Sequence, residues 1–463
     1  MRIIPLFIIF FVQLAGTLGA TNKPNVVVFL VDDFSAGALS AYGSDFHETP
    51  NIDRLAASGA SFTQGYAACT VCSPSRAAIL TGKAPARIHL TDWIVGHLSK
   101  AKGRKLRLPD WTKFVNHSEE TLAEALKSEG YKTGFFGKWH LMPYTNPAIV
   151  HQHQPEAHGF DLNVGGREWG QPKGEGKYFH PFDMPNLDSQ PDDFLTDRLT
   201  DYALGFIEEN KEDPFLLYFS YYTVHSPFMG KPDLVRKYRE KAASGNYRQT
   251  DADYAAMVES LDDSVGRVIS KLDDEGLTDD TLIIFTGDNG SDKHDYTAGL
   301  RKCKAYAYEG GVRVPLFVSG FGIPAGQEID TPAIGMDLYP TILDLAGLPL
   351  KPNQHVDGVS LKPILYGTSE IVDRALYWHY PHYHRTPPYG AVVKDDYKLI
   401  EFFEDGSLEL YNLKKDPSET TNLSTAQGDL ATELLADLRR WRMDVGAQLM
   451  VLNPEHASPS LEE

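Results

Sequence analysis

A cysteine and an arginine lie four positions apart in Cys72-Ser-Pro-Ser-Arg76, a segment that runs on through an apolar stretch to Gly82. Four positions are about one turn of an α-helix, so both side chains share a face if a helix begins at Cys72. The free backbone N–H groups of such a helix start would point at a bound anion, and the guanidinium would help to hold it. The segment therefore predicts an anion site, unless Cys72 is a buried structural thiol and Pro74 and Gly82 mark ordinary turns.

Polar side chains follow four short apolar runs that we expect to be strands of one sheet. The runs and the residues after them are 25–31 with Asp32 and Asp33, 132–137 with Lys138 and His140, 215–220 with His225, and 281–286 with Asp288 and Asn289. Ligands of open α/β sheets bind beyond the carboxyl ends of the strands. These side chains are therefore expected to meet at one edge of the sheet.

Three carboxylates and one amide of this set are oxygen donors, and such ligands suit Ca²⁺ or Mg²⁺. They belong to Asp32, Asp33, Asp288 and Asn289. Adjacent aspartates repel each other unless a cation or a lysine neutralises them. A metal site is expected here. The alternative is that Asp33 caps a helix and that Asp288-Asn289-Gly290 forms a tight turn.

Four further side chains can carry a positive charge or a proton, namely Lys138, His140, His225 and Lys304. Lysine and imidazolium donors stabilise an anion whose charge is spread over several oxygens, and they do so more strongly as charge develops on a leaving oxygen. Taken singly, either histidine could be a satisfied core residue, and Lys304 could be a solvated surface lysine. Together the four side chains favour a site for an anionic substrate.

Four motifs give the chain a resemblance to the type I sulfatases. The segment from Cys72 to Gly82 resembles the family signature, and Gly137-Lys-Trp-His140 resembles its G-K-W-H element. Tyr222-Thr-Val-His225-Ser-Pro resembles the family's histidine loop. Lys304, five positions before Glu309-Gly-Gly-Val-Arg-Val-Pro, resembles the family's second lysine, and this spacing favours it over Lys302.

The resemblance implies that a maturation enzyme converts Cys72 to formylglycine, an aldehyde whose hydrate attacks the sulfur of a sulfate ester. It also implies one divalent cation, Ca²⁺ in preference to Mg²⁺. The implied ligands of this cation are Asp32, Asp33, the modified Cys72, Asp288 and Asn289. The expected reaction releases inorganic sulfate and an alcohol.

The resemblance also implies roles for the basic residues. Arg76 and Lys138 would hold the hydrated aldehyde and the sulfate group. Either His225 or Lys304 would protonate the leaving alcohol, and His140 would deprotonate the second hydroxyl of the hydrate. These roles come from the family, because spacing alone does not supply them.

Apolar runs that alternate with helical patterns predict an α/β fold with a large, mainly parallel or mixed sheet sandwiched by helices. Helices are expected over 194–207 and 253–272, and another is expected to begin at a Ser118 cap and to end at Gly130. Residues 141–190 break this rhythm, and we interpret them either as a wall of the substrate site or as a surface excursion.

The character of the sequence changes near residue 370. Short polar-aromatic strands and a helix over 430–445 predict a small C-terminal antiparallel sheet packed on a terminal helix. The expected division is a signal peptide over 1–20, a catalytic α/β domain over 21–369 and a C-terminal subdomain over 370–463. The signal peptide rests on Arg2, an apolar run and small residues up to Ala20.

Composition narrows the possible functions. A formal net charge of -19 argues against nucleic-acid binding, and an anionic substrate would need a local basic patch. We expect an exported protein, periplasmic or secreted, with no membrane attachment once the leader is removed. If Cys72 is modified, Cys69 and Cys303 remain, and free thiols are expected in preference to a disulfide between them.

The substrate is expected to be a sulfated saccharide, with an aryl sulfate as a possible surrogate. His379, His382 and His384 alternate with aromatic residues, which suits either a sugar ring that carries sulfate or core packing between the subdomains. Two alternatives remain open at this point. One is a phosphonate or phosphodiester hydrolase of the same superfamily, and the other is a non-catalytic, calcium-stabilised glycan-binding protein.

Overall fold

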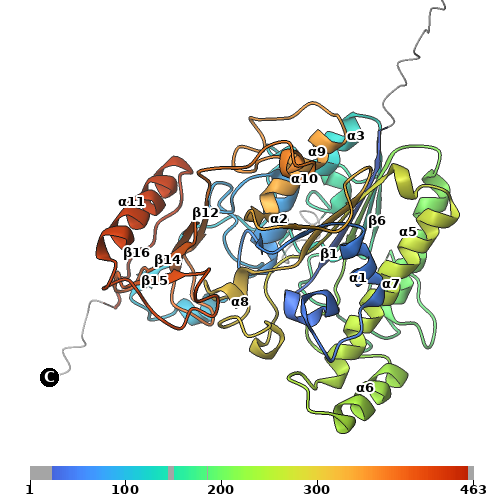
Figure 1. Cartoon of the computed structure of the whole chain (residues 1–463), viewed down its shortest axis with the longest axis horizontal. Coiled ribbons are helices and arrows are strands. Elements are labelled where there is room, and N and C mark those ends of the chain that lie inside the picture. Colours follow the sequence, from blue (N-terminus) through green and yellow to red (C-terminus); the bar gives the residue numbers. More distant parts are fainter. Residues whose placement is uncertain (1–22, 144–150, 185, 457–463) are drawn as a thin grey trace, which may run out of the picture.

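A computed structural model describes residues 23–143, 151–184 and 186–456 of the chain. The predicted signal peptide at 1–20 lies outside these residues. Among the helices described, none combines the length and the apolar character that a membrane crossing requires. Figure 1 shows a central sheet with helices on both faces and a separate sheet toward the C-terminal end.

Within the described residues, eight strands form the central sheet in the order β10-β2-β9-β8-β1-β7-β5-β6. Five neighbouring pairs are parallel, whereas β9 is antiparallel to both β8 and β2. The bounds are β1 Asn25–Val31, β2 Gly59–Phe62, β5 Lys132–Gly137, β6 Leu162–Val164, β7 Phe215–Ser220, β8 Thr281–Gly287, β9 Leu316–Gly320 and β10 Gln327–Ile329. The predicted mainly parallel sheet is confirmed.

The central strand β1 shows why the sheet is covered on both faces. Val26, Val28 and Leu30 pack into one hydrophobic cluster, and the alternate residues of the strand pack into another. The first cluster lies under α2 (Cys72–Thr81), α3 (Leu122–Ser128), α9 (Leu338–Leu345) and α10 (Lys362–Leu365). The second lies under α1 (Pro50–Ala57), α5 (Leu195–Asn210) and α7 (Ala252–Asp274), beside which α6 (Pro232–Ser244) packs.

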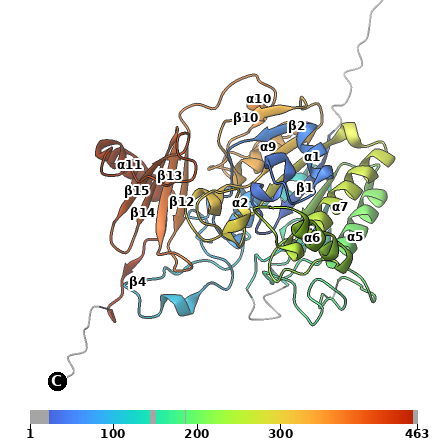
Figure 2. The ribbon, with the colours of Figure 1, turned by 60° about the horizontal axis from the view of Figure 1, so that its bottom comes forward.

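The C-terminal part is a four-stranded antiparallel sheet in the order β12-β13-β14-β15, as predicted. Its strands are β12 Ala375–Tyr380, β13 Tyr389–Lys394, β14 Tyr397–Phe402 and β15 Leu408–Asn412. Helix α11 (Gly428–Asp444) covers one face, and Figure 2 shows this sheet standing beside the main body. The short strands and the short α-helix not yet given are β3 Gly65–Tyr66, β4 Leu106–Arg107, α8 Glu309–Val312, β11 Ala333–Ile334 and β16 Val451–Leu452, and short 3-10 helices such as Pro155–His158 lie between the elements.

The prediction that Ser118 caps α3 is wrong. The cap is Thr121, whose hydroxyl accepts from the Glu124 N–H at 3.2 Å while the Glu124 carboxylate accepts from the Thr121 N–H at 2.7 Å. This reciprocal pair satisfies two free donors at once, which a single serine cap cannot do. The Ser118 N–H instead donates to the side chain of Asn116.

A buried ionic cluster joins the two sheets. The Lys398 ammonium on β14 lies 2.6 Å from the Glu309 carboxylate at the start of α8 and 3.0 Å from Glu419, and all three side chains are buried. Arg313 also pairs with Glu309. Two carboxylates therefore share one buried lysine across the junction between the catalytic sheet and the C-terminal sheet.

We predict that Lys398→Met lowers the free energy of unfolding by about 3–5 kcal/mol, because it leaves the buried Glu419 carboxylate without its ion-pair partner and removes one of the two cations beside Glu309. Denaturant unfolding measures this loss. The matched control is Lys394→Met on β13, whose side chain is partly exposed and pairs with Asp437 at 2.9 Å, and whose loss costs at most about 1 kcal/mol. Equal destabilisation by the two substitutions would contradict a special role for the buried cluster.

Candidate active site

Helix α2 places Cys72 at its first residue, as the sequence predicts. Val71 before it is extended, with φ -142° and ψ 159°, and every residue of the helix is buried. Gly82 ends the helix at φ 66°, where an added Cβ would lie 2.5 Å from the Cβ of His355. Because α2 begins at Cys72, the first backbone N–H groups of the helix have no partner within it and can face a ligand beside Cys72.

Three carboxylates from two strand ends surround Cys72. Its Sγ lies 3.5 Å from Oδ1 of Asp32 and 3.8 Å from Oδ1 of Asp33, both of which follow β1. The Asp33 N–H donates to Oδ1 of Asp288, which follows β8, at 3.0 Å. Asn289 donates from Nδ2 to Oδ1 of Asp33 at 2.7 Å. The predicted oxygen donors therefore do meet at the carboxyl edge of the sheet.

Each lysine of the predicted set pairs with one of these aspartates. The Lys138 Nζ lies 2.6 Å from Oδ2 of Asp32. The Lys304 Nζ lies 2.6 Å and 2.9 Å from the two oxygens of Asp33 and 3.3 Å from the Cys72 Sγ. Lys304 is therefore a buried residue of the site and not a solvated surface lysine, and it supplies the second ammonium group.

Arg76 forms an ion pair with the third carboxylate, that of Asp288. Its Nε and Nη2 each lie 2.8 Å from Oδ2 of Asp288. Its Nη1 donates to the carbonyl of Lys138 at 2.9 Å and to Oγ of Ser220 at 2.5 Å. The guanidinium therefore joins α2 to the ends of β5, β7 and β8. Sequence reasoning missed Ser220, although it is the polar residue that ends the third apolar run.

The two histidines occupy different positions. His225 Nε2 lies 3.5 Å from both Oδ2 of Asp33 and the Lys304 Nζ, while its Nδ1 donates to the carbonyl of Ser226 at 2.6 Å. His140 bonds through Nε2 to the carbonyl of Ile94, and its buried Nδ1 has no partner among the described residues. The carbonyl of His140 accepts from the Ser73 hydroxyl of α2 at 2.9 Å.

The comparisons with known proteins bear on this geometry. The family model described as Sulfatase matches residues 24–348. The family model described as N-sulphoglucosamine sulphohydrolase, C-terminal, matches residues 302–444. The chain belongs to the sulfatase family.

This sulfatase is 32% identical to a Sulfatase of Formosa agariphila, over 91% of this chain and 89% of that protein. It is 30% identical to human Arylsulfatase A, over 93% of this chain and 89% of that protein. The crystal structure of Ps i-CgsB in complex with k-i-k-neocarrahexaose is 28% identical, with a TM-score of 0.75, and covers 91% of this chain and 93% of its own. Family and relatives make the chain a sulfuric ester hydrolase.

Burial and pairing set the charge states of the site. Burial raises the pKa of the Cys72 thiol well above its usual value, although Lys138 and Lys304 oppose the shift. Burial also raises the pKa of Asp288 to about 6, against the opposing Arg76. At Asp33 burial acts upward as well, but Lys304, with His225 and Lys138, holds the pKa below its ordinary range. An unmodified Cys72 would therefore be a thiol and a poor nucleophile at neutral pH.

The donor set fits a hard divalent cation. Asp32, Asp33 and Asp288 are all buried and within reach of one another, and the buried Oδ1 of Asn289 has no hydrogen-bond partner in the described part of the chain. Carboxylate and amide oxygens are the ligands that Ca²⁺ takes. Potential ligand atoms of Asp32, Asp33, Cys72 and His225 lie within 4.8 Å of one another.

The histidine-rich segment on and after β12 serves core packing more than ligand binding. His379 and His382 are buried, and their rings contact Phe403 and Trp111. Trp378 donates to the carbonyl of Ala67 at 2.8 Å. Of the three histidines only His384 is partly exposed, so the packing alternative describes the other two.

We predict that Arg76→Lys lowers kcat/KM for a sulfate ester by at least about 100-fold, because one ammonium cannot replace a guanidinium that bonds Asp288, Lys138 and Ser220 together. Steady-state kinetics measures the loss. Arg87→Lys is the control, since Arg87 forms a similar two-bond pair with Asp357 at 2.7 Å but lies partly exposed after α2. A comparable loss in the control would refute the site-specific account.

Proposed function

We propose that this sulfatase hydrolyses the sulfate esters of a saccharide, through a formylglycine made from Cys72 and with a Ca²⁺ ion beside it. The observation that carries the proposal is the position of the Cys72 side chain, within 4 Å of Asp32, Asp33 and Lys304 in the charged cluster. Three carboxylates balance three fixed cations there. A divalent ion would add two positive charges, which favour a sulfate monoester anion even in a chain of net charge -19.

Conversion of Cys72 is supported by the chemistry that its surroundings allow. Burial keeps the thiol protonated, and a sulfur nucleophile would have difficulty releasing sulfate afterwards. A hydrated aldehyde offers one hydroxyl for attack on sulfur and a second whose deprotonation releases sulfate. A Ca²⁺ ion held by Asp32, Asp33, Asp288 and Asn289 would supply Lewis acidity toward the attacking hydroxyl.

Protonation of the leaving alcohol is assigned to the Lys304 and His225 pair. Lys304 lies 3.3 Å from the Cys72 sulfur and 3.5 Å from Nε2 of His225. Because the Nδ1 of His225 is engaged with Ser226, proton exchange at this ring goes through Nε2. Lys138 and Arg76 hold the opposite side of the site through Asp32 and Asp288.

His140 is the proposed base for the second hydroxyl. Since its Nε2 contacts the Ile94 carbonyl, that nitrogen carries the proton and Nδ1 keeps the lone pair. Nδ1 is buried and lacks a partner within the described residues, so it is available to a ligand proton. The His140 ring contacts Trp93, with 6.3 Å between the ring centroids, and it lies close enough to Gly170 to leave no room for a Cβ there.

A saccharide substrate is supported by a group of basic and aromatic residues that we call the rim, comprising Trp93, His97, Lys100, His384 and Arg385. The ring centroids of Trp93 and His97 lie 5.0 Å apart, and those of His97 and His384 lie 4.2 Å apart. Lys100 donates to the carbonyl of His384 at 3.1 Å. Flat rings beside exposed cations suit a sugar that carries additional sulfate groups.

The family assignment removes the non-catalytic alternative, since it makes the chain a hydrolase. The phosphonate or phosphodiester alternative is the one that needs an experiment. The fold alone does not separate the two, because a phosphonate monoester hydrolase of Agrobacterium radiobacter shares it at 22% identity and a TM-score of 0.65. Export through the predicted leader is also part of the proposal.

We predict that Cys72→Ala lowers sulfate ester hydrolysis by at least about 10⁴-fold, as loss of a nucleophile does. Mass spectrometry of the wild-type peptide over Cys72 should give the mass of the aldehyde instead of the thiol. Cys69→Ala is the control, because Cys69 is also buried and unpaired. An active Cys72→Ala protein, or an active wild type that keeps the thiol, would refute the proposed nucleophile.

The reaction class is tested with a sulfate monoester and a phosphate diester of the same leaving alcohol. The expected result is a kcat/KM that favours the sulfate ester. Faster turnover of the phosphate diester would establish the alternative activity.

We predict that Lys100→Ala raises KM for a multiply sulfated oligosaccharide several-fold while kcat for a small aryl sulfate stays unchanged. The physical reason is the loss of one rim cation that faces only the larger substrate. Lys102→Ala, two residues along and also exposed, is the control. The rim assignment is wrong if both substrates respond alike or if both lysines have the same effect.

A further inference from the structure

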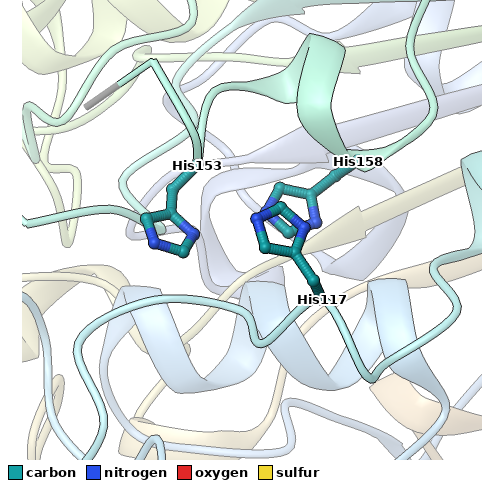
Figure 3. A group of neighbouring side chains, drawn as sticks. All are labelled: His117, His153 and His158. Atoms are coloured by element: carbon teal, nitrogen blue, oxygen red, sulfur yellow. The ribbon is translucent and has the colours of Figure 1, made fainter. Parts of the chain in front are cut away.

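Three histidines outside the active-site residues form a compact cluster, shown in Figure 3. His117 precedes α3, His153 lies just before the short helix at Pro155–His158, and His158 is the last residue of that helix. One ring nitrogen from each of the three residues lies within 4.8 Å of the other two. Segments far apart in the sequence thus bring three imidazoles to one place.

The rings are stacked instead of being scattered. The His117 ring centroid lies 4.9 Å from that of His158 and 5.2 Å from that of His153, with interplanar angles of 11° and 17°. His158 is fully buried, His153 is 6% exposed and His117 is exposed. The cluster therefore has a buried base and one side chain that can turn toward it from solvent.

The hydrogen bonding of the buried rings is incomplete. Neither ring nitrogen of His158 has a partner in the described part of the chain, and Nδ1 of His153 has none either. Buried polar groups are nearly always hydrogen-bonded, so three buried nitrogens without a partner in one place indicate a binding site for a ligand. Stacking alone would leave these nitrogens unsatisfied, whereas coordination would use one lone pair on each ring.

The backbone around the cluster is held independently of the imidazoles. The carbonyl of His158 accepts from the Thr121 hydroxyl at 2.8 Å, at the start of α3. The carbonyl of His153 accepts from the Trp139 indole N–H at 2.8 Å. Because these bonds fix where the two buried histidines lie, the rings are presented to one another before any ligand arrives.

The charge state of the rings also suits a metal. Burial, followed by repulsion from His117 and His153, lowers the pKa of His158 to about 3. Burial and His117 likewise lower the pKa of His153. Neutral imidazoles are ligands, whereas imidazolium ions are not.

We propose that His117, His153 and His158 bind a divalent transition-metal ion of the zinc class, separate from the Ca²⁺ ion of the active site. Three imidazoles without a carboxylate prefer borderline ions such as Zn²⁺ over Ca²⁺. Three protein ligands leave a fourth position, which water fills through the exposed His117 side. Tetrahedral Zn²⁺ places its nitrogens roughly 3.3 Å apart, so the rings must approach by a small rotation, which the exposed His117 permits.

Coordination would tie the turn before α3 to the 151–158 part of the long segment that follows His140. The same segment carries Arg167, whose carbonyl accepts from the His140 N–H at 2.9 Å. The metal would accordingly stabilise a wall next to the active site without taking part in the reaction.

The test uses full-length protein purified without a polyhistidine tag and kept in excess Ca²⁺, to which Zn²⁺ alone is added. Elemental analysis after dialysis counts bound zinc, and calorimetry gives its affinity. We expect His117→Ala to bind one Zn²⁺ fewer per chain, or to raise the Kd of that site by more than about 100-fold, since even outer-shell changes cost about 10- to 100-fold. Zn²⁺ should raise the Tm of the wild type and not that of His117→Ala.

His151→Ala is the matched control, because His151 is an exposed histidine two positions from His153. It should bind zinc as the wild type does. A second probe, Co²⁺, should give visible ligand-field bands in the wild type and in His151→Ala that are absent from His117→Ala. The proposal is overturned if wild type and His117→Ala bind the same amount of zinc equally tightly, or if the two alanine variants lose it alike. Since none of these readouts uses sulfate hydrolysis, they are independent of the proposed reaction.

Discussion

Three carboxylates are buried side by side at the carboxyl edge of the sheet, and the need to neutralise them determines how the active site is assembled. Asp32, Asp33 and Asp288 are at most 1% exposed, and each would be unstable there as an isolated charge. Lys138, Lys304 and Arg76 supply the compensation, and they come from the end of β5, the segment before α8 and the second turn of α2 respectively. Because no single element carries both partners, the carboxyl edge of the sheet, α2 and the segment around Lys304 must assemble together. That assembly also surrounds the side chain of Cys72.

The C-terminal sheet takes part in this arrangement at a distance. The Lys304 N–H donates to the carbonyl of Ser291, and the Ala305 N–H donates to that of Thr70, both at 2.9 Å. A few residues later the Glu309 N–H donates to the carboxylate of Glu419, which belongs to the C-terminal part. The segment that carries Lys304 is therefore fixed on one side by the residues after β8 and before α2, and on the other by Glu419, which follows β15. This gives a physical reason for a hydrolase site to require a subdomain that contributes none of the charged groups around Cys72.

Much of the fold and of the site could be predicted from the sequence, for identifiable reasons. The bounds of β1, β5 and β7 follow from apolar runs that are buried on both faces, and the residues after them meet as parallel topology requires. The predicted Ser118 cap of α3 is wrong because Thr121, with Glu124 three positions on, forms a capping box that Ser118 does not. The sequence does not show the bounds of β12, because its aromatic and histidine residues obscure the alternation of a half-buried strand. The three-histidine cluster and Ser220 depend on side-chain positions that periodicity does not report, and the division at residue 369 remains a prediction.

The central claim is that the carboxylates around Cys72 form a site for a hard cation that hydrolysis requires. Calorimetric titration of metal-depleted protein with Ca²⁺, followed through the return of sulfate ester hydrolysis, tests it most directly. The account predicts one Ca²⁺ per chain, activity that returns in proportion to occupancy, and an affinity at least about 10-fold weaker in Asn289→Ala, which removes the unpartnered amide oxygen. Full activity in metal-depleted protein, or an unchanged Ca²⁺ affinity in Asn289→Ala, would contradict it.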